Sequence, residues 1–467
     1  MNTPLPVDES ALLKTTTSRC PVCQKACPAE VWRSGHTPAR VYLKRVCAEH
    51  GDFTACIASD ARLYWLSKGA SAESGCCGGS CCSADGSNTG TLGRNAAGRG
   101  EDTFEVLSTC LALIEIVDSC NLTCPTCFAD SPVGQGAEAR VVPLENVMHR
   151  IEGVIQRKGR IEVLQLSGGE PTLHPRFFEL LAWAQQHPKI DYIIVNTNGV
   201  RIAIHDDFLA RLAEAASRKK LQLYLQFDGP QEAGQHTLRG ADLRNLREKA
   251  LDRCADIRLP VTLAMTVTRE NLPYLWDAIR FGLERPQVHG ITFQPLFTSG
   301  RIPAGIVARA DAERIAPASR LNTADVILAA IDQSEGLLRL EDFTPLPCGD
   351  PNCAIIGYLI RHDGGFRSIS DFIDFSRLQG FLQDKVRYNL DDLARCGCES
   401  EPLGDLLKKL EVDAGKTFRI MVKPFMDAWT WDQDRIDRCC THVIRPDGKL
   451  DSFCRYYSGF ADARHAP

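Results

Sequence analysis

DSCNLTCPTCFADS (residues 118–131) places Cys120, Cys124 and Cys127 in a C-x3-C-x2-C spacing. The stretch follows LALIEIV (111–117), a short apolar and β-branched run that predicts a strand. Three thiolates on one loop can hold three irons of a four-iron cubane, so the fourth iron has no protein ligand and stays open to a substrate. The stretch therefore predicts a catalytic [4Fe–4S] cluster just after a strand.

The same rhythm of short apolar runs continues along the middle of the chain. Five more candidate strands follow the first, at 162–169, 192–199, 221–229, 261–268 and 290–296. Candidate helices separate them, at 143–158, 175–187, 206–218, 241–255 and 272–284. Strands that alternate with helices predict βαβ units and a parallel sheet, and six of them indicate an α/β fold with an open or partial (βα)6 barrel. In such folds the chemistry lies at the carboxyl ends of the strands.

Polar segments stand where those strands should end. SGGEPTLHP (167–175) follows the second strand, and the absence of side chains at Gly168 and Gly169 allows the backbone to approach a ligand closely. NTNG (196–199), QFDG (226–229) and TVT (266–268) follow the third, fourth and fifth strands, and Gln294 is placed similarly on the sixth. These segments are the expected active-site loops.

The cysteine content points to metal ligation. The chain has 467 residues, 21 cysteines and a net charge of −5. Its first residues lack the apolar stretch of a secretory signal, and no run of about 18 apolar residues predicts a membrane span. We therefore expect a cytoplasmic protein, where reduced thiols bind metals rather than pair as disulfides. The chain has no excess of basic residues, so we do not expect nucleic acid as a partner.

Four regions can be separated along the chain. Residues 1–66 carry a small Cys/His module, and 67–105 are a Cys- and Gly-rich linker. Residues 106–300 hold the predicted barrel, and cysteines return in 301–467, the predicted auxiliary-cluster region.

The first module has the spacing of a zinc ribbon or a rubredoxin-type site. CPVCQKAC (20–27) and CAEHG (47–51) offer Cys20, Cys23 and Cys47 as ligands of one zinc or iron ion. His50, Cys27 and Cys56 are candidates for the fourth ligand.

The remaining cysteines form two further groups. GCCGGSCC (75–82) supplies Cys76, Cys77, Cys81 and Cys82, which together with Cys110 could hold an auxiliary cluster. The C-terminal group could converge on another auxiliary cluster; it comprises Cys348, Cys353, Cys396, Cys398, Cys439, Cys440 and Cys454. The turn sequence RPDG (445–448) predicts a hairpin that folds Cys454 back towards Cys439 and Cys440. A structural zinc knuckle is the alternative for this group, and Cys254 is expected to be a core residue.

The cysteine loop and the GGEP segment together resemble the radical SAM superfamily. The resemblance implies that S-adenosylmethionine (SAM) chelates the open iron, and that its reductive cleavage yields a radical that abstracts hydrogen from an unactivated carbon. It assigns Gly168, Gly169 and Glu170 to the methionyl amine of SAM. It further implies ribose and carboxylate contacts at the other strand ends, from Asn196, Asn198, Gln226, Asp228 and Thr266.

Longer segments at both ends resemble one group within that superfamily. CPVC with C-x2-HG, the 109–131 stretch and FMDAWTWDQDRIDRCCTHVIRPDGKLDSFCRYY (425–457) are similar to the group that contains tetraether lipid synthase and dihydropterin methyltransferase. That group carries a catalytic cluster, two auxiliary clusters and a mononuclear metal site. The chain departs from it at GCCGGSCC.

Three functions compete on this evidence. The first is C–C bond formation, or alkyl or one-carbon transfer, on a small-molecule or lipid-like substrate, with a reductant such as ferredoxin or flavodoxin. The second is transfer of a SAM-derived group to a thiophilic element such as arsenic, suggested by the paired cysteines. The third is a non-catalytic iron–sulfur carrier, which would need no SAM pocket.

Overall fold

The structure is a computed structural model that describes residues 10–66, 109–218, 220–302, 315–316, 319–346, 349–362, 364–372 and 417–459. The GCCGGSCC segment with Cys76, Cys77, Cys81 and Cys82 lies outside the described residues, as do Cys348, Cys396 and Cys398.

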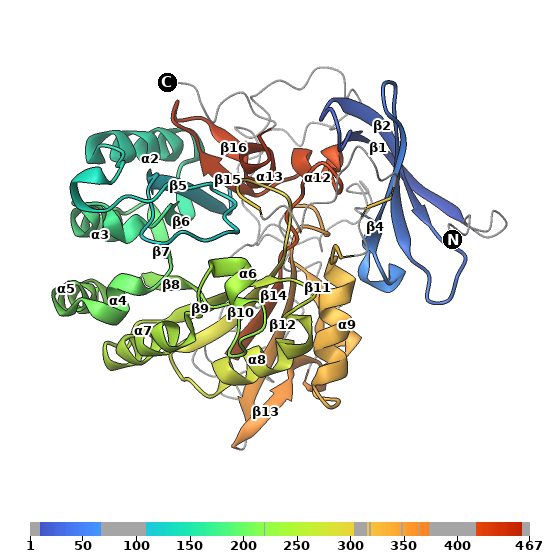
Figure 1. Ribbon diagram of the computed structural model, residues 1–467. Coiled ribbons are helices and arrows are strands. Elements are labelled where there is room, and N and C mark those ends of the chain that lie inside the picture. Colours follow the sequence, from blue (N-terminus) through green and yellow to red (C-terminus); the bar gives the residue numbers. More distant parts are fainter. Residues whose placement is uncertain are drawn as a thin grey trace, which may run out of the picture.

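Six parallel strands form the centre of the larger sheet (Figure 1). They are β5 (Leu111–Val117), β6 (Ile161–Gly168), β7 (Ile190–Thr197), β8 (Leu221–Gln226), β9 (Val261–Val267) and β10 (Val288–Pro295). Each pairs in parallel with the next in chain order. The predicted α/β fold and its six strands are therefore confirmed.

Helices connect these strands and lie on one side of the sheet (Figure 1). The longer ones are α2 (Leu144–Lys158), α3 (Phe177–Gln186), α5 (Asp206–Ser217), α7 (Arg244–Asp256) and α8 (Leu275–Leu283), and the short ones are α4 (Val200–Ile204) and α6 (Gln235–Arg239). The helix expected at 272–284 begins instead with a 3₁₀ turn, Leu272–Tyr274. Pro273 has no N–H to donate, so it fits the first turn of a helix but not its interior.

Strand β8 separates an apolar outer face from a more polar inner face. In β8, Leu221, Leu223 and Leu225 are buried in the main hydrophobic core, whereas Gln222, Tyr224 and Gln226 line an internal cavity. Strands of a parallel sheet are usually apolar on both faces. The alternation in β8 therefore places polar residues in the cavity, to which Val163, Ile194 and Ile291 of the other strands add apolar ones.

The C-terminal part of the chain adds strands to both edges of this sheet. At one edge β14 (Thr417–Val422) pairs in parallel with β10, followed by β12 (Ile355–His362) and then by β11 (Thr344–Pro345) and β13 (Gly365–Ser368), each paired with β12. At the other edge β15 (Thr441–Ile444) pairs in parallel with β5, and β16 (Leu450–Ser452) folds back on it as the predicted hairpin. Helices α9 (Thr323–Gln333), α12 (Gln433–Asp437) and α13 (Phe453–Tyr457) belong to the same part.

The N-terminal module is a four-stranded antiparallel sheet. Its strands are β1 (Ala11–Arg19), β2 (Ala26–Arg33), β3 (Val41–Cys47) and β4 (Gly51–Ala58). Buried Arg45 donates to the carbonyls of Ala428 and Trp429, and Lys14 pairs with Asp432 at 2.6 Å. Figure 1 shows the result, with the blue sheet standing beside α12.

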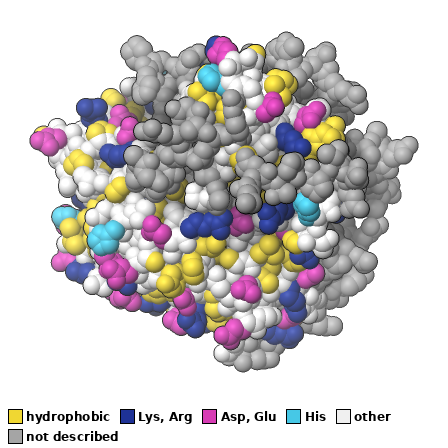
Figure 2. All heavy atoms as spheres, turned by 45° about the vertical axis from the view of Figure 1, so that its right-hand side comes forward, with side chains coloured by type: hydrophobic (Ala, Val, Ile, Leu, Met, Phe, Trp, Pro, Cys, Tyr) yellow, Lys and Arg dark blue, Asp and Glu magenta, His cyan; other side chains and the backbone are white. Residues whose placement is uncertain are grey.

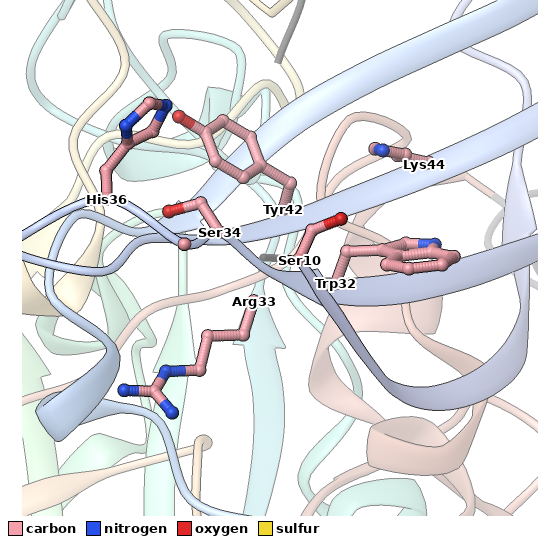
Figure 3. A pocket seen from close by; sticks show the side chains of 8 residues that line it. Ser10, Trp32, Arg33, Ser34, His36, Tyr42 and Lys44 are labelled. Atoms are coloured by element: carbon pink, nitrogen blue, oxygen red, sulfur yellow. The ribbon is translucent and has the colours of Figure 1, made fainter. Parts of the chain in front are cut away.

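The outer surface offers weaker candidates for a site. A small pocket beside β2 and β3 holds only about 10 Å³ of free volume, and Arg33 points away from the other side chains that line it (Figure 3). On the face drawn in Figure 2, basic and acidic side chains are interspersed rather than gathered by sign. Within the described ranges, no helix has the length and apolar character needed to cross a bilayer.

Candidate active site

The site is a cavity of about 500 Å³ inside the barrel. The thiols of Cys120, Cys124 and Cys127 line it, on the loop that follows β5. Residues from the carboxyl ends of the neighbouring strands line it as well: Gly168, Gly169, Glu170, Asn196, Asn198, Gln226 and Thr266. The structure thus brings together nearly all the residues expected to hold a cluster and SAM.

Backbone hydrogen bonds from distant segments fix the cysteine loop. The amide of Cys120 donates to the carbonyl of Pro132 at 2.8 Å, and Cys127 exchanges two hydrogen bonds with Arg301 at 2.8 and 2.9 Å. Phe128 packs edge-on against Tyr457 of α13, with ring centroids 4.8 Å apart. The three thiols are therefore held by the barrel and by the C-terminal segment together.

The cysteine loop is suited to bind a cation. Burial raises the pKa of Cys120 to about 12 and also raises the pKa of Cys124, so in the absence of a cation both would stay protonated. Iron supplies the positive charge that makes the thiolate form favourable. Since the thiols share one end of an open cavity, the residues fit a [4Fe–4S] cluster with one accessible iron.

Gly168 and Gly169 are required because the cysteine loop lies directly against them. The amide of Gly169 donates to the carbonyl of Val117 at 2.7 Å. A Cβ at Gly168 would lie 2.0 Å from that carbonyl oxygen, and one at Gly169 would lie 2.2 Å from the carbonyl oxygen of Ser119. The two glycines therefore let the segment after β6 pack against the start of the cysteine loop, a role that the sequence pattern alone did not reveal.

Glu170 is a buried junction between two strand ends. Its carboxylate accepts from the amide of Thr172 at 3.2 Å, the hydroxyls of Thr172 and Thr197 at 2.7 and 2.8 Å, and the amide of Asn198 at 2.8 Å. Burial raises its pKa, and these four donors act against that shift. Glu170 thus positions the segments after β6 and β7 beside the cysteine loop.

We expect Glu170→Gln to weaken SAM binding by about ten- to a hundredfold while the iron content stays unchanged. Each charge-assisted hydrogen bond contributes roughly 1.5–3 kcal/mol, and a carboxamide cannot accept all four. The measurement is equilibrium binding of SAM to reconstituted enzyme, with iron analysis in parallel. Glu214→Gln, on the exposed face of α5, is the matched control. Unchanged SAM affinity in the Glu170 variant would contradict this role.

Asn198 links β7 to the cysteine loop. Its side-chain amide donates to the Asn121 carbonyl oxygen at 2.6 Å and lies 3.7 Å from the Cys120 sulfur. Asn196, two residues earlier on β7, donates to Ser167 at 3.1 Å and lines the same cavity. Both residues are placed to contact a molecule bound next to the cluster.

Asp228 differs from the expected direct contact with SAM. It is 1% exposed, is bound by Arg239 through contacts of 2.6 and 2.8 Å, and accepts from the Thr266 amide at 3.0 Å. Arg239 lines the cavity, and its charge opposes the effect of burial on the pKa of Cys124. The guanidinium is therefore a positive charge beside the cluster loop, and Asp228 holds it there.

Sequence reasoning missed Arg239 and the polar lining of the barrel. Arg239 lies on the short helix α6, eleven residues beyond Asp228, and no motif marks it. The lining was visible in principle, as the alternation of LQLYLQ (221–226). Six carboxamides line the cavity: Gln165, Asn196, Asn198, Gln222, Gln226 and Gln294.

The N-terminal module forms a four-ligand metal site. The ligand atoms of Cys20, Cys23, Cys47 and His50 all lie within 4.8 Å of one another. The Cys23 and Cys47 sulfurs are 3.8 Å apart, and His50 Nδ1 lies 3.7 and 3.6 Å from the Cys20 and Cys47 sulfurs. A tetrahedral zinc ion with bonds of about 2.3 Å to sulfur places two sulfurs about 3.8 Å apart. Among the three candidates for the fourth ligand, the geometry thus selects His50.

The two other candidate ligands stand outside this group of four. Cys27 packs beside it, in a cluster with Cys20, Cys47 and Trp429, and Cys56 contacts the carbonyl of Ala58 at 3.5 Å. Cys254 is fully buried in the main core, as predicted.

Cys439 and Cys440 face different neighbours. Cys439 interacts electrostatically with Cys353 and Cys454, and burial raises the pKa of all three thiols. Cys440 lines the cavity with Cys110, whose amide donates to the Cys440 carbonyl at 3.1 Å. The described C-terminal cysteines therefore divide into two groups at the cavity wall.

Two family models match the chain. Residues 114–282 match the radical SAM superfamily, and residues 12–59 match the HMPTM N-terminal zinc ribbon domain. The first range covers the cysteine loop and strands β6 to β9, and the second contains the Cys20–His50 metal site.

Relatives with known activities are similar to the chain over different spans. The 7,8-dihydro-6-hydroxymethylpterin dimethyltransferase of Methanocaldococcus jannaschii is 25% identical, over 95% of this chain and 93% of its own. The GTP 3′,8-cyclase of Syntrophomonas wolfei is 25% identical, over 63% of this chain and 86% of its own. A solved structure of SuiB from Streptococcus suis with S-adenosylmethionine overlaps 44% of this chain and 45% of its own, at 14% identity and a TM-score of 0.35.

Proposed function

We propose that this chain, a radical SAM enzyme whose superfamily domain spans residues 114–282, transfers a SAM-derived one-carbon or alkyl group to an unactivated carbon of a polar, nitrogen-rich small molecule. The observation that carries the proposal is the row of carboxamides along the barrel wall, in the same cavity as the cluster thiols. The pterin substrate in the name of the Methanocaldococcus relative, which matches over 95% of this chain, supports it.

The carboxamides favour a substrate with polar edges. Each offers both a donor and an acceptor, which suits the edges of a planar heterocycle and leaves unpaired polar groups against an alkyl chain. Hydrogen bonds hold them in place: Gln165 donates to Asn196, and Gln294 donates to the Tyr224 hydroxyl at 2.8 Å. A preorganised polar wall of this kind favours a pterin-like ring over the lipid alternative.

The chain's own residues position the reactants. Cys120, Cys124 and Cys127 would hold the cluster, and the segment from Gly168 to Glu170 would place the methionyl end of SAM beside it. The bound cluster and SAM supply the radical chemistry. The barrel wall orients the substrate carbon towards them, and burial in the cavity excludes water.

The direct test is turnover with a defined substrate. Anaerobically reconstituted enzyme is incubated with SAM, dithionite and 7,8-dihydro-6-hydroxymethylpterin, and products are identified by mass spectrometry. We expect a pterin whose mass is increased by one or two methyl groups, labelled when labelled SAM is used. SAM cleavage without any change in this pterin or in related heterocycles would contradict the proposed substrate class.

We further propose that Cys353, Cys439 and Cys454 help to hold an auxiliary cluster. Arg435, half-buried, lies with its guanidinium 3.8 Å from the Cys353 sulfur, and the Met426 amide points at the Cys454 sulfur at 3.3 Å. Positive charge and an N–H donor beside the thiols are what an anionic cluster would need. Cys440 and Cys110 would belong to a second auxiliary site.

The double variant Cys439→Ala, Cys454→Ala is expected to lose about one cluster's iron and to stop product formation, while SAM cleavage continues. The reason is that the catalytic loop draws no ligand from this group. Iron and sulfide analysis, with product assays, measures both effects. Zinc in place of the lost iron would favour a structural knuckle, and full iron content with full turnover would contradict the assignment.

A further inference from the structure

One charge in the cavity has no partner among the described residues. Glu170, Arg239, Arg419 and Lys423 are the charged residues of its described lining. Glu170 is satisfied by four donors and Arg239 by Asp228, and Lys423 donates to Thr441 at 2.9 Å near the Cys353 group. Arg419 is half-buried and makes no side-chain hydrogen bond or ion pair within the described ranges. A partly desolvated cation is costly unless a counter-charge meets it.

Arg419 lies far from the cluster. It is on β14 opposite Gly290 of β10, and Tyr358 of β12 is its other cross-strand neighbour. Gly290 is near the amino end of β10, whereas the cysteine loop is at the carboxyl ends of the strands. Five residues of extended strand separate Gly290 from the last residue of β10, or about 16 Å. The cysteine loop therefore lies at one end of the cavity, and Arg419 lies towards the other.

The backbone around Arg419 is shaped to expose it. A Cβ at Gly290 would lie 2.9 Å from the Arg419 Cβ, so β10 leaves space where the arginine stem crosses. The pairing of β9 with β10 shifts register between Val288 and Gly290, which makes His289 the extra residue of a β-bulge. Bulges next to active sites often redirect a side chain. His289 lines the cavity, and burial together with the charge of Arg419 lowers its pKa.

We infer that Arg419 and His289 form an oxyanion subsite at the base of the barrel, which binds a phosphate or carboxylate group at the end of the substrate remote from the reacting carbon. The guanidinium fork can donate to two oxygens of such a group, and the imidazole can donate to a third position. The inference deepens the proposed function, on which it rests for the identity of the cavity as the substrate site. The substrate would thus be an elongated polar heterocycle with an anionic tail.

The test measures binding to anaerobic holoenzyme by calorimetry. The first arm compares 7,8-dihydro-6-hydroxymethylpterin with its phosphate monoester. The second arm uses inorganic pyrophosphate and glutarate alone, which distinguishes a phosphate from a carboxylate preference. Each ligand is titrated into the unaltered enzyme, Arg419→Met, Arg419→Lys and Arg33→Met. Arg33 is exposed on the N-terminal module and serves as the matched control.

We expect the ester to bind at least tenfold more tightly than the alcohol, and Arg419→Met to abolish that gain. Arg419→Lys should retain part of it, which separates loss of charge from loss of fold, and Arg33→Met should retain all of it. Pyrophosphate or glutarate binding that depends on Arg419 would sustain the subsite even if neither pterin binds, and only the pterin proposal would then fail. Equal binding of alcohol and ester, with no Arg419-dependent binding of either small anion, would overturn the subsite.

Discussion

Replacing Cys120, Cys124 and Cys127 with alanine is expected to reduce 5′-deoxyadenosine formation to background and to remove about four irons per chain. Each thiolate is one of three that the loop offers to a cubane, so losing them leaves the irons without protein ligands. The three lie on a single loop that lines the cavity, and the other described cysteines at the cavity wall, Cys110, Cys353 and Cys440, come from different segments. Iron analysis and chromatography of SAM products measure the two effects.

Cys254→Ala is the matched control for this experiment. Cys254, on α7, is fully buried in the hydrophobic core, and burial alone raises its pKa to about 12. Its replacement should cost about 1 kcal/mol of stability and leave iron content and SAM cleavage unchanged. SAM cleavage that persisted in the triple alanine variant would refute the assignment of the catalytic loop.

Gly169→Ala is expected to lower SAM cleavage by about a hundredfold or more. The added methyl would lie 2.2 Å from the Ser119 oxygen and 2.5 Å from its carbonyl carbon, so one of the two backbones must move. Displacing reacting groups by about 1 Å can cost a hundredfold in rate. Because Ser119 directly precedes Cys120, we expect weaker cluster retention as well, measured as iron per chain after gel filtration.

Gly153→Ala tests whether any added methyl has this effect. Gly153 lies in α2, where a Cβ would meet only the flexible end of Arg157 at 3.2 Å. This variant should be more stable by about 0.5–1 kcal/mol because alanine favours the helix. Its SAM cleavage should equal that of the unaltered enzyme. Equal activity in both glycine variants would show that the close backbone contact at Gly169 does not affect SAM cleavage.

Local patterns predicted the barrel well because its signals are short in range. Each strand of the barrel is an apolar run of six to eight residues, such as β9 (Val261–Val267), followed by a helix of regular length. The cysteine loop and the GGEP segment carried their chemistry in consecutive residues. These features depend on neighbours in the sequence, and the structure confirmed the strands, the helices and the C-terminal hairpin.

Features that depend on distant segments could not be read from the sequence. That two adjacent cysteines face different sides is expected of extended backbone, but the neighbours that Cys439 and Cys440 meet follow from β15 joining the edge of β5, some 330 residues away along the chain. Arg239 became a site residue only because α6 folds back over the cysteine loop, where the Thr126 amide contacts the Leu238 carbonyl at 3.4 Å. His289 faces the cavity through a bulge, a backbone irregularity that the residue pattern of β10 does not encode.

The central claim is that the loop of Cys120, Cys124 and Cys127 holds a cluster that cleaves SAM. The most direct measurement is the formation of 5′-deoxyadenosine by anaerobically reconstituted, dithionite-reduced enzyme with SAM, beside the triple alanine variant. We predict SAM-dependent 5′-deoxyadenosine from the unaltered enzyme and none above background from the variant. Absence of any SAM-derived product from enzyme that carries its full complement of iron and sulfide would contradict the claim.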